Sequence, residues 1–273
     1  MGEKIVEIMD LTFAYPDGTV ALENINLSLE RGSITALIGQ NGCGKTTLSK
    51  LVNGILRPTS GSIVVGGLDV SGGCPIKDLV LNIGYVFQNP DHQLFNSTVY
   101  DEIAYAPRNV GLGGEEVDSR VREAARISGV SESLFEESPM LLSRGLRQRV
   151  AIASILSLRP KLIIVDEPTT GQDRSQSLEV MEFLKGLNET AGNSILIITH
   201  EMDIVAQYAS RIIVMKRGAI LMSGTPAEVF SRPDLLMEGF VKPPLATRVA
   251  QALDPSGAKG AVINYEGLLS AFA

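Results

Sequence analysis

The sequence Gly39-Gln40-Asn41-Gly42-Cys43-Gly44-Lys45-Thr46-Thr47 decides the fold of this chain. It follows the apolar run Ile34–Ile38, which is typical of a buried strand, and it precedes Leu48–Val52, whose apolar positions fit a helix packed on a sheet. The spacing G-x-x-x-x-G-K-[ST] in a strand, turn and helix context predicts a loop that surrounds the phosphates of a nucleotide. The alternative is a glycine-rich turn with an incidental Lys-Thr pair, and the full pattern favours the nucleotide site. We call residues 39–47 the phosphate loop.

Each residue type in the phosphate loop suits this chemistry. Gly39, Gly42 and Gly44 can adopt backbone angles that a side chain would forbid, so main-chain N–H groups can face the phosphates. The following helix adds unpaired N–H donors and its positive dipole end. We expect Lys45 to neutralise the β- and γ-phosphates and the Thr46 hydroxyl to be a ligand of Mg²⁺. The predicted nucleotide-binding set is the whole loop: Gly39, Gln40, Asn41, Gly42, Cys43 (through its backbone N–H), Gly44, Lys45, Thr46 and Thr47.

Composition narrows the class of protein. The 273 residues can bury a large core, and a net charge of −7 argues against a broad nucleic-acid-binding face, so we expect no nucleic-acid partner. The two cysteines, Cys43 and Cys74, form neither a disulfide framework nor a metal-ligand set. No apolar run approaches the ~20 residues that cross a bilayer, and the start shows no signal-peptide core. We therefore expect a cytosolic chain.

Strand-like runs surround the phosphate loop. Lys4–Phe13 and Ala21–Leu29 predict an antiparallel edge sheet, joined by turn residues at Tyr15–Gly18. Further short strands are predicted at 62–65, 83–87, 161–165, 194–199, 211–215 and 219–222. These patterns predict an α/β fold: a P-loop NTPase core with a mixed, mainly parallel sheet, preceded by an antiparallel β subdomain.

The pattern changes to helical spacing between the predicted strands at 83–87 and 161–165. Thr98 can cap a first helix, Glu115–Val130 supplies a second, and Ser143 is a possible N-cap of a third. Beyond Pro233 the chain has helical pieces broken by prolines and glycine. We predict a main domain over residues 1–233 that contains a helical insert at about 98–160, and a C-terminal extension over 234–273.

Polar side chains stand at the ends of several predicted strands, where parallel sheets place ligand contacts. Asp166 suits a Mg²⁺-bound water and Glu167 suits an attacking water, whereas simple solvation of a strand end is the alternative for both. His200 could contact a γ-phosphate oxygen, although a lone histidine there is usually incidental. Gln88 belongs to the same group, with a strand-ending turn as its alternative. Tyr15 could stack on an adenine or merely pack partially.

Together these motifs resemble the ATPase subunits of ABC transporters over about residues 3–232. The resemblance implies the following motifs: Tyr15 as the adenine-stacking aromatic, Gly39–Thr47 as Walker A, Gln88 as the Q-loop, Leu142–Leu146 as the signature, Leu162–Glu167 as Walker B with the catalytic glutamate, Gln172-Asp173 in the D-loop, and His200 as the switch histidine. Within the family, residues 86–95, 169–173 and 242–244 are most similar to energy-coupling factor ATPases, which drive uptake of vitamins and of cobalt or nickel.

The resemblance also implies a mechanism and partners. Two ATP molecules would be sandwiched in a dimer, each between Walker A of one chain and the signature of the other. Mg²⁺ would be held by Thr46 and Gln88 with Asp166 one water away, and Lys45, Gln88, Glu167 and His200 would act in catalysis. We expect an integral membrane transporter subunit and a second ATPase chain, like or unlike, as partners. The chain would then lie peripherally on the cytoplasmic face of the cell membrane.

The signature departs from the family pattern Leu-Ser-Gly-Gly-Gln. Ser143 and Gly145 are present and are predicted to contact the partner's ATP, but Arg144 adds bulk and charge, and Leu146 removes an amide. Two other functions stay open: a soluble ABC ATPase of repair, translation or cluster assembly, and, suggested by Arg144 and Leu146, a nucleotide-binding partner with little hydrolysis of its own.

Overall fold

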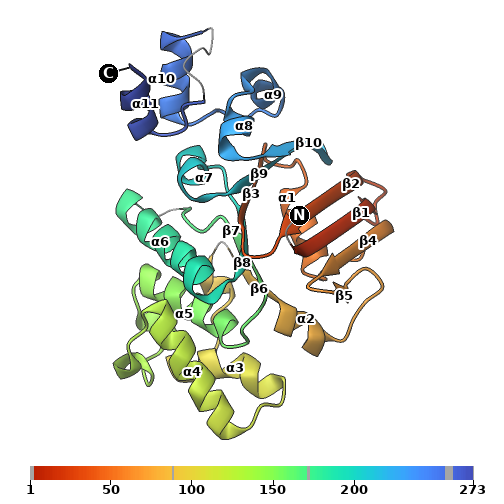
Figure 1. The fold of residues 1–273 in the computed structure, drawn as a ribbon. Coiled ribbons are helices and arrows are strands. Elements are labelled where there is room, and N and C mark those ends of the chain that lie inside the picture. Colours follow the sequence, from red (N-terminus) through yellow and green to blue (C-terminus); the bar gives the residue numbers. More distant parts are fainter. Residues whose placement is uncertain (1–2, 88, 171–172, 256–260, 273) are drawn as a thin grey trace.

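The N-terminal strands form an antiparallel sheet. In a computed structural model, which describes residues 3–87, 89–170, 173–255 and 261–272, its strand order is β2-β1-β4-β5 (Figure 1). Its strands are β1 (Lys4–Ala14), β2 (Val20–Glu30), β4 (Ser60–Val65) and β5 (Leu68–Asp69). β1 and β2 contribute Leu11, Leu22 and Ile25 to the core, each with none of its surface exposed. The predicted antiparallel edge sheet is confirmed.

The second sheet has six strands in the order β10-β9-β3-β8-β7-β6. Neighbours from β9 to β6 run parallel, and only β10 is antiparallel to its neighbour. The predicted α/β fold with a mainly parallel sheet is therefore confirmed. The strands are β3 (Ile34–Gly39), β6 (Ile83–Val86), β7 (Leu162–Asp166), β8 (Ser194–Ile198), β9 (Arg211–Lys216) and β10 (Ala219–Gly224).

The helical elements between β6 and β7 cover one side of this sheet (Figure 1). Two predicted caps are present: Thr98 accepts from the N–H of Asp101, and Ser143 accepts from the N–H of Leu146. Thr225 also forms a capping box with Glu228. The helices are α1 (Lys45–Val52), α2 (Ile76–Asn82), α3 (Val99–Asn109), α4 (Gly114–Ser128), α5 (Arg144–Leu156), α6 (Arg174–Ala191), α7 (Met202–Tyr208), α8 (Pro226–Phe230), α9 (Pro233–Glu238), α10 (Leu245–Leu253) and α11 (Tyr265–Phe272), with 3₁₀ turns at Pro90–His92, Glu132–Leu134 and Pro139–Leu141.

The core lies on both faces of the six-stranded sheet. Along β7, Ile163 and Val165 pack with α3, α4, α5 and α6, whereas Leu162 and Ile164 pack against α1 and the antiparallel sheet. This alternation follows from the two-residue period of a strand. Burying each such side chain contributes about 1.5–3 kcal/mol. The carboxyl end of β7, at Asp166, is thereby held between two packed layers.

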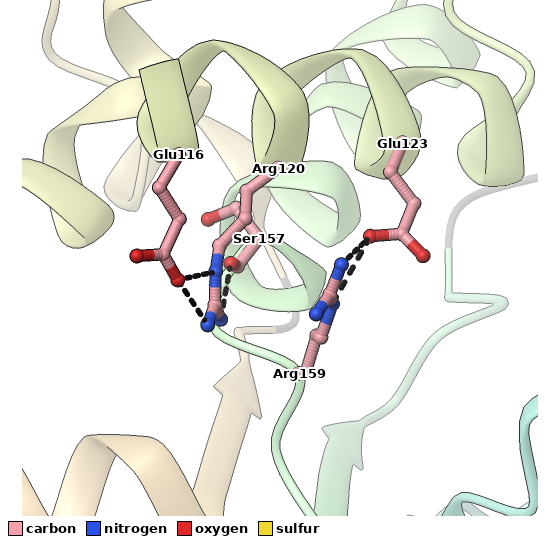
Figure 2. Close-up of polar contacts among 5 residues, drawn as sticks. All are labelled: Glu116, Arg120, Glu123, Ser157 and Arg159. Atoms are coloured by element: carbon pink, nitrogen blue, oxygen red, sulfur yellow. Dashed lines mark hydrogen bonds and ion pairs between the residues drawn. The ribbon is translucent and has the colours of Figure 1, made fainter. Parts of the chain in front are cut away.

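Charged side chains tie α4 to the connection between α5 and β7 (Figure 2). Arg120 donates to Glu116 Oε1 at 2.9 and 3.1 Å and to the Ser157 carbonyl at 3.4 Å. Arg159 Nε donates to Glu123 Oε2 at 3.0 Å. Exposed pairs of this kind contribute at most about 1 kcal/mol each. Their effect is mainly to fix where the chain leaves the helical region and enters β7.

The C-terminal helices form a small cluster at the end of the molecule opposite α3 and α4 (Figure 1). In this cluster Ala246 and Ala250 of α10 pack with Val262 and with Leu268 of α11. The Thr247 hydroxyl donates to the Val262 carbonyl at 2.7 Å. None of the helices in the described ranges is both long and apolar enough to cross a membrane. The predicted boundaries at residues 98, 160 and 233 stay predictions.

Candidate functional site

A cavity of about 800 Å³ lies at the carboxyl ends of β3, β7 and β8. These strands bring together residues from distant parts of the chain, because their parallel register aligns Asp166 with Ile198. Its lining contains these predicted site residues: Tyr15, Asn41, Gly42, Gly44, Lys45, Thr46, Thr47, Asp166, Glu167 and His200. Residues outside the predicted set also line it: Thr19, Val20, Ala21, Thr170, Ile198, Arg217 and Gly218.

Two glycines of the phosphate loop allow close backbone approach. At Gly39 (φ 149°) an added Cβ would lie 2.3 Å from the Met215 carbonyl oxygen of β9. At Gly44 (φ 107°) it would lie 2.7 Å from a methyl carbon of Leu22 on β2. Glycine is therefore required at both positions, for steric reasons as well as for its left-handed backbone angles. The phosphate loop is therefore packed closely between β2 of one sheet and β9 of the other.

Lys45 lies across its own loop. Its Nζ donates to the carbonyl oxygens of Gly39 at 2.7 Å and Gln40 at 3.1 Å, and the side chain is buried. The predicted loop residues Gly39, Gln40 and Cys43 do not line the cavity. Burial raises the pKa of the Cys43 thiol above its usual range, although nearby Lys45 lowers it. The Cys43 side chain is buried in the core, and its carbonyl accepts from the N–H of Gly218 at 2.9 Å.

Tyr15 stands over the start of α1. Its hydroxyl shares a hydrogen bond of 2.9 Å with the Thr47 hydroxyl, and its ring meets Phe13 edge-on at 4.9 Å. The turn is closed by the Gly18 N–H donating to the Tyr15 carbonyl at 2.9 Å. Tyr15 lines the cavity and is 38% exposed, so a flat ligand could lie against its ring.

Arg217 is a cavity residue that the sequence analysis did not identify. It lies in the tight turn between β9 and β10, with φ 46° at Arg217 and 80° at Gly218. The Gly218 carbonyl accepts from the N–H of Glu23, which fixes this turn against β2. The sequence signal was a basic residue in a hairpin turn, and only the strand order places that turn beside the phosphate loop.

Glu167 and His200 contact each other directly. His200 Nδ1 lies 2.8 Å from Glu167 Oε2, and the Thr170 hydroxyl donates to the same oxygen at 3.0 Å. Glu167 has a left-handed backbone with φ 51°, and its N–H donates to the Ile198 carbonyl at 2.8 Å. Such a conformation costs a non-glycine residue roughly 1–3 kcal/mol and tends to occur at functional sites.

Asp166 is partly buried and is held by a tyrosine that was not predicted. Tyr85 on β6 donates its hydroxyl to Asp166 Oδ2 at 3.0 Å and lies 3.2 Å from the Ser49 hydroxyl of α1. Burial raises the pKa of Asp166; the Tyr85 hydrogen bond and Lys45 lower it, while the charge of Glu167 raises it further. Burial also raises the pKa of Tyr85, so its hydroxyl keeps its proton and stays a donor.

The atoms that Asp166 and Thr46 offer to a metal ion are hard oxygens. Thr46 and Asp166 line the same cavity, and the described residues contain no group of three or more histidine, cysteine or acidic side chains arranged to hold a metal. A hard, strongly hydrated cation that takes most of its ligands from water and phosphate needs only one or two protein oxygens. The residues present therefore fit such a cation. Gln88, the other predicted ligand, lies outside the described residues.

The predicted signature residues lie apart from this cavity. Ser143 caps α5 and is exposed, and Gly145 lines a separate small hollow between α5 and α6. The cavity and the signature surface are therefore two distinct regions of the chain. Arg144 links them: its Nη2 donates to the carbonyl of Thr170, a cavity residue, at 2.8 Å.

The sequence profile described as ABC transporter matches residues 22–170, from β2 to Thr170. The chain belongs to the ABC transporter family. The match includes the phosphate loop, the signature segment and β7, which are the elements that build the two regions above. Among ABC transporter relatives, the energy-coupling factor transporter ATP-binding protein EcfA of Methanocaldococcus jannaschii is 42% identical over 92% of this chain and 89% of its own length.

Solved structures of this ABC transporter family share the fold. CbiO1 of Clostridium perfringens, described as part of the CbiONQ ABC transporter complex, superposes with a TM-score of 0.79 at 37% identity, covering 91% of this chain and 99% of CbiO1. An ATP-binding cassette in a dimeric post-hydrolysis state with ADP and Pi gives a TM-score of 0.70 at 27% identity, covering 81% and 98%.

Some relatives are longer than this chain. The chain is 46% identical to a protein of Caldanaerobacter subterraneus and 42% identical to one of Methanosarcina acetivorans, in each case over 92% of its own residues. It spans only 44% and 41% of their lengths.

Proposed function

We propose that this chain is the ATP-hydrolysing subunit of an energy-coupling factor importer, which powers uptake of a solute across the cytoplasmic membrane. The observation that carries this proposal is the single cavity that brings the phosphate loop, Asp166, Glu167 and His200 together. Relatives named as energy-coupling factor ATP-binding proteins, which match over most of both chains, support the transport role.

ATP would bind along the cavity from Tyr15 to the strand ends. The exposed ring of Tyr15 would stack on the adenine, and the loop N–H groups with the α1 N-terminus would hold the phosphates. Lys45 would exchange its two carbonyl partners for phosphate oxygens, which are stronger acceptors for an ammonium group. Arg217 adds a cation at the cavity wall, where it could meet the ribose or the α-phosphate.

Thr46, Asp166 and Gln88 are the residues that would hold Mg²⁺, with Asp166 acting through a water. The bound ion would supply charge neutralisation at the β- and γ-phosphates. Tyr85 would orient Asp166 by its hydrogen bond of 3.0 Å, in the way that outer-shell donors fix metal-binding carboxylates.

Glu167 would orient or deprotonate the attacking water, and His200 would contact the γ-phosphate. The Thr170 hydroxyl and His200 Nδ1 both hold Glu167 Oε2, so the carboxylate is positioned before substrate arrives. Preorganised polar groups are the usual source of catalysis in phosphoryl transfer.

Two such ATPase chains would assemble head to tail. The exposed signature residues Ser143 and Gly145 lie away from this chain's own cavity, so they would serve the ATP of a second, like or unlike, ATPase chain. A relative of the same fold that was solved as a dimer with ADP and Pi supports this arrangement. Closure on ATP and opening after hydrolysis would then be the mechanical cycle.

An exposed aromatic surface on the helical region would receive the membrane subunit. Phe95 and Tyr105 are 63% and 45% exposed and meet edge-on at 4.8 Å. The loop that carries Phe95 is fixed by buried Glu102, which accepts from the N–H groups of Phe95 and Asn96 at 2.9 and 2.7 Å. Exposed aromatic clusters on rigid supports favour protein contacts. Peripheral attachment to the membrane would follow.

Two measurements test this function. Purified chain, alone and with its membrane subunit, should hydrolyse ATP in a Mg²⁺-dependent reaction, and tagged chain from gently solubilised membranes should carry an integral membrane protein. Phe95→Ser should weaken that co-purification while leaving ATP binding intact. Absence of any membrane partner would instead favour a soluble ABC ATPase.

A second function is a nucleotide-binding subunit with little turnover, because Arg144 and Leu146 alter the surface that faces the partner's ATP. ATP binding without turnover by this chain, next to an active second subunit, would favour it.

A further inference from the structure

The turn after β7 is held from the start of α5. The Thr170 N–H donates to the Glu167 carbonyl at 3.3 Å and closes the turn. Two side chains of α5 then bind its carbonyls: Gln148 donates to Pro168 O at 2.8 Å and Arg144 donates to Thr170 O at 2.8 Å. Gln148 is buried, whereas Arg144 lies at the exposed first turn of the helix. These two hydrogen bonds hold the turn that carries Glu167 against α5.

The hydrogen bond from Arg144 is made to Thr170, the residue whose side chain also holds the Glu167 carboxylate. Thr170 uses its carbonyl to accept from Arg144 and its hydroxyl to donate to Glu167 Oε2 at 3.0 Å. The same oxygen lies 2.8 Å from His200 Nδ1. A continuous chain of contacts therefore runs from the guanidinium of Arg144 through Thr170 and Glu167 to His200.

Glu167 needs such support because its backbone is strained. Its φ of 51° is unfavourable for a residue with a side chain, and it persists only where surrounding contacts fix it. Contacts of Glu167 include its N–H bond to Ile198 O, the Thr170 N–H bond to its carbonyl, the Thr170 hydroxyl and the His200 ring. Loss of the Arg144 bond to Thr170 would loosen the contacts that Thr170 makes to Glu167 and let the carboxylate shift.

We propose that Arg144, although it lies in the signature segment, is a positioning residue for Glu167 of its own chain. This inference rests on the proposed ATPase function. Arg144 is one of the residues at which this signature departs from the usual pattern. It would act on the ATP site of its own chain, whereas the rest of the signature faces the ATP of the second subunit. A guanidinium suits this role because it reaches a backbone carbonyl with a rigid, always charged donor.

The test separates the two sites of an assembled pair. In the cis assembly, this chain keeps Glu167 and the second subunit carries glutamine at its catalytic glutamate. In the trans assembly, this chain carries Glu167→Gln and the second subunit is intact. Arg144→Met, which keeps much of the apolar stem but no donor, is placed in this chain in both.

In the cis assembly we expect Arg144→Met to lower kcat about tenfold with KM for ATP within about twofold, because small displacements of catalytic groups cost one to two orders of magnitude in rate. Arg144→Lys should recover most of that loss. In the trans assembly the change should stay within about twofold. Arg149→Met is the matched control, since Arg149 on the same helix bonds the Ser128 carbonyl and Glu179 instead. An equal loss in both assemblies, or a loss only in trans, overturns the proposal.

A second readout needs no hydrolysis. The chain has two histidines, His92 and His200, so ring signals in an NMR spectrum can be assigned by one substitution. In the nucleotide-free chain, Arg144→Met should shift the His200 ring signals and leave His92 unchanged, whereas Arg149→Met should shift neither. An unmoved His200 signal overturns the proposal even if the chain proves to be an ATPase. Absence of ATPase activity in the unsubstituted assembly contradicts the proposed function and leaves this measurement to decide the role of Arg144.

Discussion

His200 and Glu167 meet through one atom of each side chain, Nδ1 and Oε2, at 2.8 Å. The histidine is 62% exposed and the glutamate 15%, so the pair has one partner open to the cavity and one set into the protein. The less exposed partner, Glu167, is also held by the Thr170 hydroxyl. Glu167 therefore has the more contacts of the two, and His200 is the member of the pair that is more open to a ligand.

Replacing Glu167 with glutamine should separate ATP binding from hydrolysis. The amide keeps the shape of the side chain and the bond to Thr170 but cannot accept a proton, so turnover should fall by about 10²–10⁴. ATP affinity should stay within about threefold, which equilibrium binding would measure beside steady-state hydrolysis. Turnover like that of the unsubstituted chain would remove Glu167 from its proposed role.

Replacing Tyr85 with phenylalanine should weaken the response to Mg²⁺. The change removes the donor at 3.0 Å from Asp166 and the contact with Ser49, while the ring keeps its packing in the core. Loss of an outer-shell hydrogen bond typically costs 10–100-fold in metal affinity. We expect the Mg²⁺ concentration for half-maximal hydrolysis to rise about tenfold at saturating ATP.

The matched control for Tyr85 is Tyr105→Phe, which removes a hydroxyl from an exposed ring on α3 that does not line the cavity. It should leave the Mg²⁺ response unchanged. Equal responses for the two variants would show that Tyr85 does not act through Asp166.

Replacing Asp166 with asparagine should stabilise the nucleotide-free chain while abolishing Mg²⁺-dependent hydrolysis. Burial raises the pKa of Asp166 above 3.8, so the folded chain binds this proton more strongly than the unfolded chain. The stability that this group contributes is complete below pH 3.8 and is lost as the pH rises through its raised pKa. At neutral pH the ionised carboxylate is therefore destabilising, and the neutral amide removes that penalty.

Thermal unfolding measures whether Asp166→Asn stabilises or destabilises the chain. The midpoint of Asp166→Asn should lie above that of the parent chain at pH 7, by about 2–4 °C for each kcal/mol removed, and the difference should shrink as the pH is lowered toward 4. Asp69→Asn is the control, because a hydrogen bond from the Ser71 backbone lowers the pKa of Asp69 and its neutralisation should not stabilise. A midpoint for Asp166→Asn below the parent at pH 7 would contradict the argument.

The strands and the phosphate loop were predictable because their signals are local. Apolar runs such as Ile34–Ile38 and the spacing from Gly39 to Thr47 report on a few consecutive residues. Tyr85 was not predicted, because its partner Asp166 is 81 positions away and becomes a neighbour only when β6 pairs with β7. That pairing aligns Tyr85 with Ile164, on the same face as Asp166, so the strand order would have been enough to find it.

Other features of the site could not be predicted from the sequence, because they depend on side-chain geometry. The position of Lys45 across its own loop, and the bond from Arg144 to Thr170, depend on which acceptor a long flexible side chain reaches. The sequence analysis placed Arg144 at the second subunit's ATP. The structure shows in addition a contact within the same chain, which spacing along the sequence cannot reveal.

Replacing Tyr15 tests whether its ring stacks on the adenine. Tyr15→Ala removes the ring and should raise the dissociation constant for ATP about tenfold, since stacking of a base on an aromatic ring contributes about 1–3 kcal/mol. Tyr15→Phe removes only the hydroxyl that bonds Thr47 and should stay within about threefold. The contrast between the two variants separates stacking from support of α1.

Arg217→Ala tests another residue that lines the cavity. If its guanidinium meets the ribose or α-phosphate, the variant should lose affinity for ATP and ADP about equally, because both nucleotides carry those groups. A charge that acted on the γ-phosphate would instead weaken ATP alone. Arg211→Ala, at the start of the same strand β9 and outside the cavity, serves as the control and should leave both affinities unchanged. Equal binding by Arg217→Ala and the parent chain would mean that the β9–β10 turn shapes the cavity without contacting the nucleotide.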